Sequence, residues 1–253
     1  MIRKPNFKLN WKYALGEVAL IFVGISLAIA FQNWNDQRKK EILEKVYLEE
    51  LLDDCRRDST LLASYIKLSE GKYIDGLEVY KSLETRVIQW DSSYFISRLF
   101  FTGRYLEYRP YFPTYDELIS TGNLNVIENR VLKDDIRKFI QRSRNDQTFW
   151  ANEFRQRKQN YNEHIYQYFD AEIMSMLWEL PTVERDDGSR DKVITRNNVM
   201  GAFRTDIKGF FNDPKSKIMV ESCKGVDRDL VRTYGVDLNN LSEIMDQIRF
   251  ELK

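Results

Sequence analysis

The sequence predicts an all-α protein, in which an N-terminal transmembrane helix continues into a long amphipathic helix that packs in an antiparallel helical bundle. One run near the start is apolar and long enough to cross a bilayer. Beyond it, apolar residues recur three and four positions apart, the period of a helix with one buried face. Only 11 glycines and five prolines occur in 253 residues, so few positions interrupt these helices. We expect a basic N-terminal segment (1–11), a transmembrane helix (12–34) and a soluble helical bundle domain (35–253).

The apolar run, KYALGEVALIFVGISLAIAFQNW at residues 12–34, has the length and the flanks of a membrane anchor. As a helix, its last 22 residues extend about 33 Å, close to the ~30 Å thickness of the hydrocarbon core. Trp11 and Tyr13 stand at one end and Trp34 at the other, where amphipathic rings favour the headgroup level. The single charge, Glu17, lies within two turns of the start, so its carboxylate can extend to the interface; a functional intramembrane acid is the alternative.

Two other features of the apolar run admit other interpretations. Residues 28–30 (Ala-Ile-Ala) fit the A-x-A pattern of a signal-peptide cleavage site. We favour a retained anchor, because the helical pattern continues past this point without a break. Gly24 and Ala28 form a small-xxx-small pair that would let two such helices pack closely, which makes a homodimer a candidate assembly.

The orientation of the anchor is predicted from the charges on its two sides. Basic residues without any acid precede the run, whereas those that follow it are mixed with acids. The uncompensated N-terminal cluster favours an N-terminus inside the cell. We therefore expect a single-pass protein of the inner (cytoplasmic) membrane, with its C-terminal domain in the periplasm or otherwise outside the cytoplasm.

The first amphipathic helix is expected to leave the membrane as a continuous rod. Residues 35–70 contain neither glycine nor proline, and their pattern continues past Gly71 and Gly76. A coiled-coil stalk is the alternative, although the repeat is not a clean heptad. Neighbouring carboxylates such as Asp53 and Asp54 point about 100° apart on a helix, and we expect them on its solvated face.

A short apolar helix at residues 93–101 is followed by a connection at 102–113, where Gly103, Pro110 and Pro113 disfavour regular structure. Tyrosine and arginine are plentiful around this connection, a composition typical of interface hot spots and equally of a core rim. The candidate interaction residues are Arg98, Arg104, Tyr105, Tyr108, Arg109 and Tyr111.

A structural turn is predicted after this connection. Thr114 and Glu117 have the spacing of a capping box, in which each side chain would accept a bond from the other residue's amide. Gly122 would end the short helix in the left-handed conformation. Asn123 and Asn125 would belong to the tight turn that follows, before a new helix.

The second half of the chain is expected to be helical around one polar loop. The apolar pattern predicts one long helix over residues 130–177, capped by Asn129, and a helix over 193–211. Asp213 followed by proline predicts the start of the last helix, with bends or boundaries near its two glycines, Gly225 and Gly235. The loop between, 181–192, is rich in acids, but it lacks the alternating acids and distal glutamate of a calcium loop.

Composition and motifs indicate no enzyme, cofactor or metal. Lys plus Arg and Asp plus Glu number 39 each, which argues against nucleic-acid binding. The single histidine, His164, and two distant cysteines do not make an ordinary zinc site or a Cys–His nucleophile. We expect Cys55 and Cys223 to be buried thiols, although an oxidising compartment would let them pair. No phosphate-binding or serine-hydrolase motif occurs.

Three segments resemble a bacterial family of uncharacterised single-pass membrane proteins, known only as a domain of unknown function. These segments are GEVALIFVGISLAIAFQNWND, TYDELISTGNLNVIENRVL and the terminal IRFEL, so the resemblance extends over nearly the whole chain. The residues at 16–17 and 33–35 match the recurring anchor motif, and those at 117–118 and 120–124 match the recurring turn. The resemblance implies a membrane-anchored helical protein, and it implies no activity, substrate or cofactor. The glycines of the last helical region depart from it.

These observations favour a non-catalytic interaction or scaffold module outside the inner membrane. Its expected partners are the lipid bilayer, an unidentified protein and a second copy of the chain. The alternative is a single-pass sensor or signalling accessory protein. Because only about ten residues precede the span, a sensor would need a partner protein to pass its signal on.

Overall fold

The computed structural model describes residues 11–88, 92–179, 182–184, 190–192 and 203–253. Three long helices dominate it: α1 (Trp11–Thr85, 75 residues), α4 (Arg130–Ile165, 36 residues) and α8 (Pro214–Glu251, 38 residues). The shorter elements are α2 (Ser92–Thr102), α3 (Pro113–Ser120), the 3-10 turn η1 (Asn123–Val126), α5 (Glu172–Glu179), α7 (Ile207–Asn212) and an antiparallel pair of strands, β1 (Thr182–Glu184) and β2 (Arg190–Lys192). The all-α bundle predicted from the sequence is confirmed.

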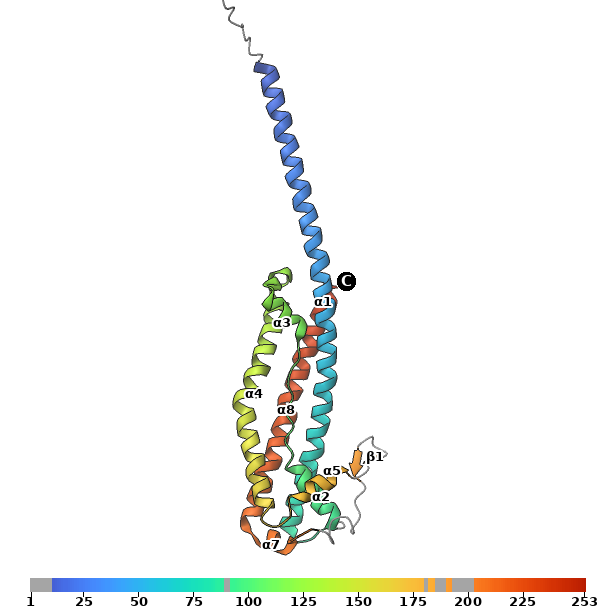
Figure 1. The fold of residues 1–253 in the computed structure, drawn as a ribbon, viewed down its shortest axis with the longest axis vertical. Coiled ribbons are helices and arrows are strands. Elements are labelled where there is room, and N and C mark those ends of the chain that lie inside the picture. Colours follow the sequence, from blue (N-terminus) through green and yellow to red (C-terminus); the bar gives the residue numbers. More distant parts are fainter. Residues whose placement is uncertain (1–10, 89–91, 180–181, 185–189, 193–202) are drawn as a thin grey trace, which may run out of the picture.

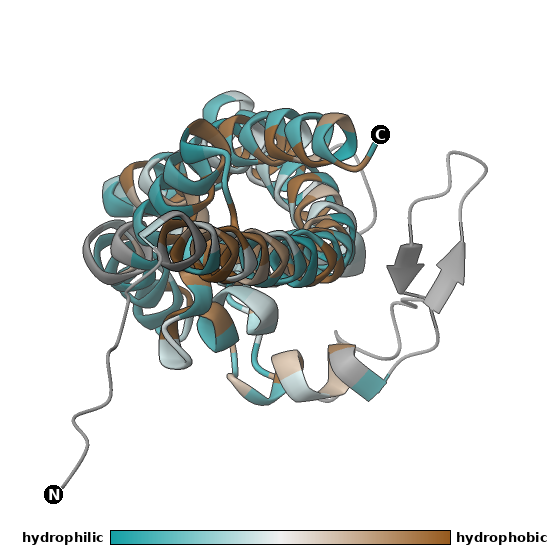
Figure 2. Ribbon diagram, turned by 90° about the horizontal axis from the view of Figure 1, so that it is seen from above, coloured by the Kyte–Doolittle hydropathy of each residue, from teal (hydrophilic) through white to brown (hydrophobic). Residues whose placement is uncertain are grey.

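The lower part of α1 packs with α4 and α8 to form the bundle (Figure 1). Helix α8 returns from α7 toward the anchor side, so it runs antiparallel to both of the other long helices. Viewed along the length of the bundle, its long helices carry hydrophobic and hydrophilic residues side by side (Figure 2). This is the pattern of amphipathic helices that bury one face each.

Helix α1 is unbroken from the apolar run to the far end of the bundle. It passes Gly71 and Gly76 and ends at Thr85, as its continuous pattern predicted. The apolar run is exposed all round, whereas buried positions begin at Tyr47. Among the described residues, α1 is the one helix long and apolar enough to cross a membrane. The structure therefore has one candidate membrane span, joined to the bundle without a loop.

Two apolar clusters form the core, one nearer the apolar run and one at the far end. The anchor-side cluster includes Tyr47, Leu51, Leu62, Leu118, Leu132, Leu241 and Ile248. The far cluster includes Val79, Phe95, Leu99, Phe100, Tyr161, Phe169, Phe210 and Val220. Helix α2 contributes Phe95 and Phe100 to the far cluster.

The helix predicted over residues 130–177 is wrong as a single element. Helix α4 ends at Ile165, a turn follows, and α5 begins at Glu172. Phe169 lies in this turn with its side chain fully buried, and its backbone pairs with Thr205 in an isolated antiparallel bridge. The apolar spacing continued through the turn because the turn also faces the core.

The capping box predicted at the start of α3 is also wrong. The N-cap lies two residues earlier, at Phe112, which makes no side-chain capping bond, and the helix begins at Pro113. The Thr114 amide donates instead to the Asp54 carboxylate at 3.0 Å, while the Glu117 carboxylate accepts from the hydroxyl of Tyr47 at 3.2 Å. Both residues thus join α3 to α1 and do not cap α3.

Other predicted helix ends are confirmed. Gly122 has φ +72° directly after α3, and Asn123 and Asn125 lie in η1. Asn129 accepts bonds from the first amides of α4. Asp213 likewise caps α8 by accepting from the amide of Lys215.

Helix α8 runs through Gly225 and Gly235 without interruption, so the boundaries expected there are wrong. A glycine lowers helix propensity by about 1 kcal/mol, which packing of the apolar face readily offsets. Of the helix predicted over 193–211, residues 193–202 lie outside the described residues, and 203–211 are helical only within α7. The acidic loop considered for calcium lies outside the described residues from 185 to 189.

Candidate functional site: the strap and its buried ion cluster

The connection between α2 and α3 is an extended segment, residues 103–112, which we call the strap (Figure 1). It rises along the bundle from the far end to the anchor side. An extended chain has no helical hydrogen bonds, so its buried amide and carbonyl groups need other partners. The part of the chain that the structure describes places no strand beside the strap. Side chains from the long helices bind its backbone instead.

Each long helix contributes such a side chain. Lys72 of α1 donates to the carbonyl oxygen of Arg104 at 3.0 Å. The Tyr108 amide donates to the hydroxyl oxygen of Tyr234, on α8, at 3.1 Å. Asn162 of α4 binds the strap at its first residue. These bonds tie the strap to all three helices, so the strap closes the bundle as a structural element.

Gly103 is required where the strap begins. The Asn162 side-chain amide donates to the Gly103 carbonyl at 3.1 Å. A Cβ at Gly103 would lie 2.0 Å from the Asn162 side-chain oxygen and 3.0 Å from the ring of Tyr161. Glycine is the residue that permits this close approach of strap and α4.

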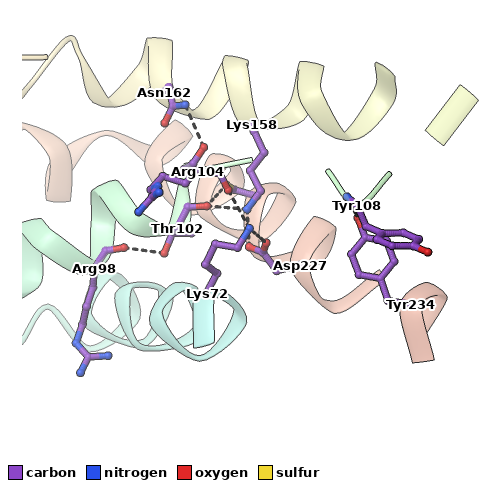
Figure 3. A network of polar contacts seen from close by, with 11 residues as sticks. Lys72, Arg98, Thr102, Arg104, Tyr108, Lys158, Asn162, Asp227 and Tyr234 are labelled. Carbon is purple, nitrogen blue, oxygen red and sulfur yellow. Dashed lines mark hydrogen bonds and ion pairs between the residues drawn. The ribbon is translucent and has the colours of Figure 1, made fainter. Parts of the chain in front are cut away.

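A buried ion cluster stands beneath the strap, at the boundary between the two apolar clusters. Asp227 of α8 lies between Lys72 of α1 and Lys158 of α4 (Figure 3). Its Oδ1 is 2.9 Å from the Lys72 ammonium, and its Oδ2 accepts from Lys158. Lys158 also donates to the carbonyl of Thr102 at 2.6 Å. The side chains are 5%, 2% and 0% exposed for Lys72, Lys158 and Asp227, so water contributes almost nothing to their solvation.

The cluster holds two ammonium groups against one carboxylate. Burial lowers the pKa of Lys72, because the charged form loses its hydration; the carboxylate of Asp227 opposes this shift and the ammonium of Lys158 adds to it. Burial raises the pKa of the neighbouring Cys223 thiol to about 12. That thiol donates to the carbonyl of Thr102 at 3.3 Å. A protonated, buried thiol is unreactive. The cluster joins the helices to the strap, because Lys72 binds the carbonyl of Arg104 and Lys158 binds the carbonyl of Thr102.

Tyr108 anchors the middle of the strap. It is buried, and its hydroxyl donates to the carboxylate of Asp58 on α1 at 2.5 Å. Burial raises the pKa of Asp58, while the bond from Tyr108 acts in the opposite direction. Burial also raises the pKa of Tyr108, as does its bond to Asp58. Its ring makes edge contacts with Tyr65 and Tyr234, at centroid distances of 6.1 and 5.7 Å.

The six candidate interaction residues divide between interior and surface. Tyr108 is internal, and Arg98 is mostly buried in ion pairs with acids of α1. Arg104 and Tyr105 are half-buried. Arg109 and Tyr111 are exposed, at 74% for the Arg109 side chain and 62% for Tyr111. The exposed part of the predicted surface is therefore the upper half of the strap.

Two hollows flank Tyr105. One, of about 50 Å³, lies between strap, α4 and α8 and is lined by Tyr105, Glu107, Tyr108, Ser143, Trp150, Ala151, Phe154, Leu230, Thr233, Tyr234 and Asp237. The other, about 380 Å³ and more open, is lined by Gly103, Tyr105, Arg155, Lys158, Gln159, Asn162, Glu163 and Tyr166. The ammonium of Lys158 is turned inward to Asp227, so only its stem lines the open hollow.

The two cysteines and the single histidine lie in the interior of the bundle. Both cysteines are free and buried, as expected. His164 lies near the end of α4, where its Nε2 is 2.8 Å from the hydroxyl of Ser216 in α8, and burial lowers its pKa. Within the described ranges, no group of three histidine, cysteine or acidic side chains is placed to hold a metal ion.

The predicted anchor residues all lie in the exposed part of α1. Trp11, Glu17 and Trp34 are exposed, and Trp34 packs on Phe31 at a centroid distance of 5.8 Å. Gly24 borders open space, and Ala28 beside it is exposed. The side chain of Tyr13 lies outside the described residues.

Sequence reasoning missed the ion cluster. Lys158 follows the buried Phe154 by four positions and precedes the buried Tyr161 by three, and Asp227 stands in the same way between Cys223 and Leu230. A charged residue at a core position of an apolar helical stripe was therefore a signal in the sequence from which a buried ion cluster could have been predicted. The expectation that Asp54 is solvated is wrong for the same reason, since it is buried and holds the Thr114 amide.

Comparison with known proteins gives a family and no activity. A model of a family of unknown function, DUF6090, matches residues 17–172, more than half of the chain. The match includes residues 17–34 of the apolar run, the strap and the turn, and it ends before α8, so the terminal IRFEL lies outside it. Neither the curated proteins nor the solved structures contain a match. The chain belongs to the DUF6090 family of unknown function.

Proposed function

We propose that this protein is a non-catalytic, single-pass membrane module that presents a protein-binding surface outside the inner membrane. The observation that carries the proposal is the unbroken helix α1, whose exposed apolar run passes directly into the bundle core. A helix without a hinge keeps the bundle at a fixed distance and angle from the bilayer, which suits a scaffold. The structural use of the buried charges, which hold the strap, supports a non-catalytic role.

The upper strap is the binding surface that we propose. Arg109 and Tyr111 are exposed there, and the guanidinium of Arg57 lies over the Tyr111 ring at 5.2 Å. Arginine and tyrosine are the residues that most often dominate binding energy at interfaces. The strap beneath them is bonded to three helices, so the surface is preorganised and little entropy is lost on binding.

Site-specific crosslinking in cells tests this function. A photo-reactive amino acid is placed at Arg109 or Tyr111 of the full chain, with exposed Lys81 on α1 as the matched control. We expect the two strap positions to capture the same partner and the control to capture none. Equal capture from all three positions, or capture from none, would contradict the proposal.

The orientation is tested by reporters fused after Lys253. One reporter should be active only outside the cytoplasm and a second only inside it. We expect activity of the outside reporter, because the basic residues before the span favour an inside N-terminus. Activity of the inside reporter alone would place the strap in the cytoplasm and change the set of partners.

A sensor is the second candidate, and the rigidity of α1 favours it. A continuous helix can carry a shift of the bundle into the membrane, whereas a flexible linker cannot. Replacement of Gln37 by proline breaks this continuity at an exposed position. A scaffold and a sensor should both keep their strap crosslinks in that variant. Only a sensor should lose the response of its partner.

A further inference from the structure

We infer that the anchor-side end of the bundle rests on the bilayer surface, with exposed apolar side chains in the phospholipid headgroup layer. This end, which we call the collar, consists of residues 117–133, from the end of α3 through η1 to the start of α4, and residues 248–253 at the end of α8. The inference rests on the proposed membrane anchor and adds a second contact with the lipid. Figure 1 shows the collar and the C-terminus beside the point where α1 leaves the bundle.

The collar is fixed close to the membrane anchor. The carboxylate of Glu128 accepts from Lys40 at 2.7 Å, and the Glu128 amide donates to the carboxylate of Glu44 at 2.6 Å. The collar is thus tied to α1 within six to ten residues of Trp34. Along a helix, six to ten residues correspond to about 9–15 Å.

The distance between collar and span is comparable with the thickness of the headgroup layer. The headgroup layer adds roughly 5–8 Å on each side of the hydrocarbon core. Spanning helices tilt by about 20°, and neighbouring helices stand 8–10 Å apart, so the tilt moves one side of the collar closer by roughly 3–4 Å. The gap between collar and headgroup layer therefore closes at the level of Lys40 and is roughly 3–7 Å at the level of Glu44.

The collar exposes apolar side chains. Ile119, Val131 and Phe250 are 51%, 65% and 73% exposed. Ile42 and Val46 of α1, which lie at the same level, are also exposed. Scattered apolar side chains are ordinary on a soluble surface. The apolar side chains of the collar lie at the end of the bundle that α1 joins to the membrane span. Transfer of their apolar surface from water into the headgroup layer is favourable.

Spin-label accessibility in nanodiscs tests the inference with the full chain. Single labels are attached through Val131→Cys, Phe250→Cys and, as the matched control, Ile218→Cys. Ile218 is 63% exposed on α8, about 48 Å along that helix from Phe250. The native thiols Cys55 and Cys223 are buried and do not compete for the label.

We expect the ratio of oxygen to nickel-chelate accessibility to be several-fold higher at Val131 and Phe250 than at Ile218. Equal ratios at the three positions would overturn the inference. A fourth label at Leu27→Cys, in the apolar run, reports on the anchor itself. A lipid-like Leu27 with water-like collar labels refutes only the collar contact, whereas a water-like Leu27 refutes the proposed anchor and the collar contact together.

Discussion

Replacement of Asp227 by asparagine should lower the free energy of unfolding, because it leaves the two buried ammonium groups that hold helices and strap together without a counter-charge. Asp227 lies 2.9 Å from Lys72 and is fully buried. At this distance and an effective dielectric constant near 20, the attraction is about 6 kcal/mol, which desolvation of both ions largely offsets. Removing one partner of a buried pair costs about 3–5 kcal/mol, a large fraction of a typical stability of 5–15 kcal/mol.

The assay is urea unfolding of the full chain in detergent micelles, followed by circular dichroism. Asp229→Asn, two residues away and half-exposed, is the control and should change the stability by less than about 0.5 kcal/mol. Adding Lys72→Met to Asp227→Asn removes one unpaired ammonium, so the double variant should lose less than the sum of the single losses. The reasoning is refuted if Asp227→Asn behaves like Asp229→Asn, or if the two losses simply add.

Three further perturbations follow from individual contacts. Because burial lowers the pKa of His164, the unfolded chain binds a proton more readily than the folded chain, so stability should fall as the pH drops below about 6.5. Melting temperatures measured from pH 7 to 5.5 should show this fall. His164→Gln replaces the only histidine of the sequence and should flatten this part of the profile. Tyr234→Phe removes the acceptor of the Tyr108 amide and should cost about 1–3 kcal/mol in urea unfolding, whereas half-buried Tyr94→Phe should cost clearly less. Gly122→Ala should destabilise by about 1–2 kcal/mol because φ is +72°, whereas Gly225→Ala within α8 should stabilise by about 0.5–1 kcal/mol; the same sign for both would contradict the backbone argument.

The helices were predictable because their signals are local. The absence of glycine and proline over residues 35–70 predicted the continuous α1, and Asp213 with the following proline predicted the start of α8. Caps, turns and apolar stripes depend on residues within a few positions of one another. A single sequence contains that information directly.

The errors arise where tertiary contacts override local preference. Thr114 and Glu117 have the spacing of a capping box, yet Asp54 and Tyr47 of α1 bind them more favourably. The periodicity across Phe169 continued through a turn because a buried turn and a buried helix face both require apolar side chains.

The sequence indicated the strap as a candidate site, but it did not show how the strap is held in the fold. Composition directed attention to the strap and could not distinguish internal Tyr108 from exposed Tyr111. The strap needs backbone partners because it is extended, and those partners come from helices more than 30 residues away. Such pairing follows only from the assembled fold.

The central claim is that one rigid helix joins the bilayer span to the bundle core. Double electron–electron resonance between labels at Leu27→Cys and Leu61→Cys, both exposed on α1, measures this directly in nanodiscs. An unbroken helix predicts a narrow distance distribution centred near 51 Å for 34 residues. A broad distribution, or a clearly shorter mean distance, would show a hinge between span and bundle and contradict the account.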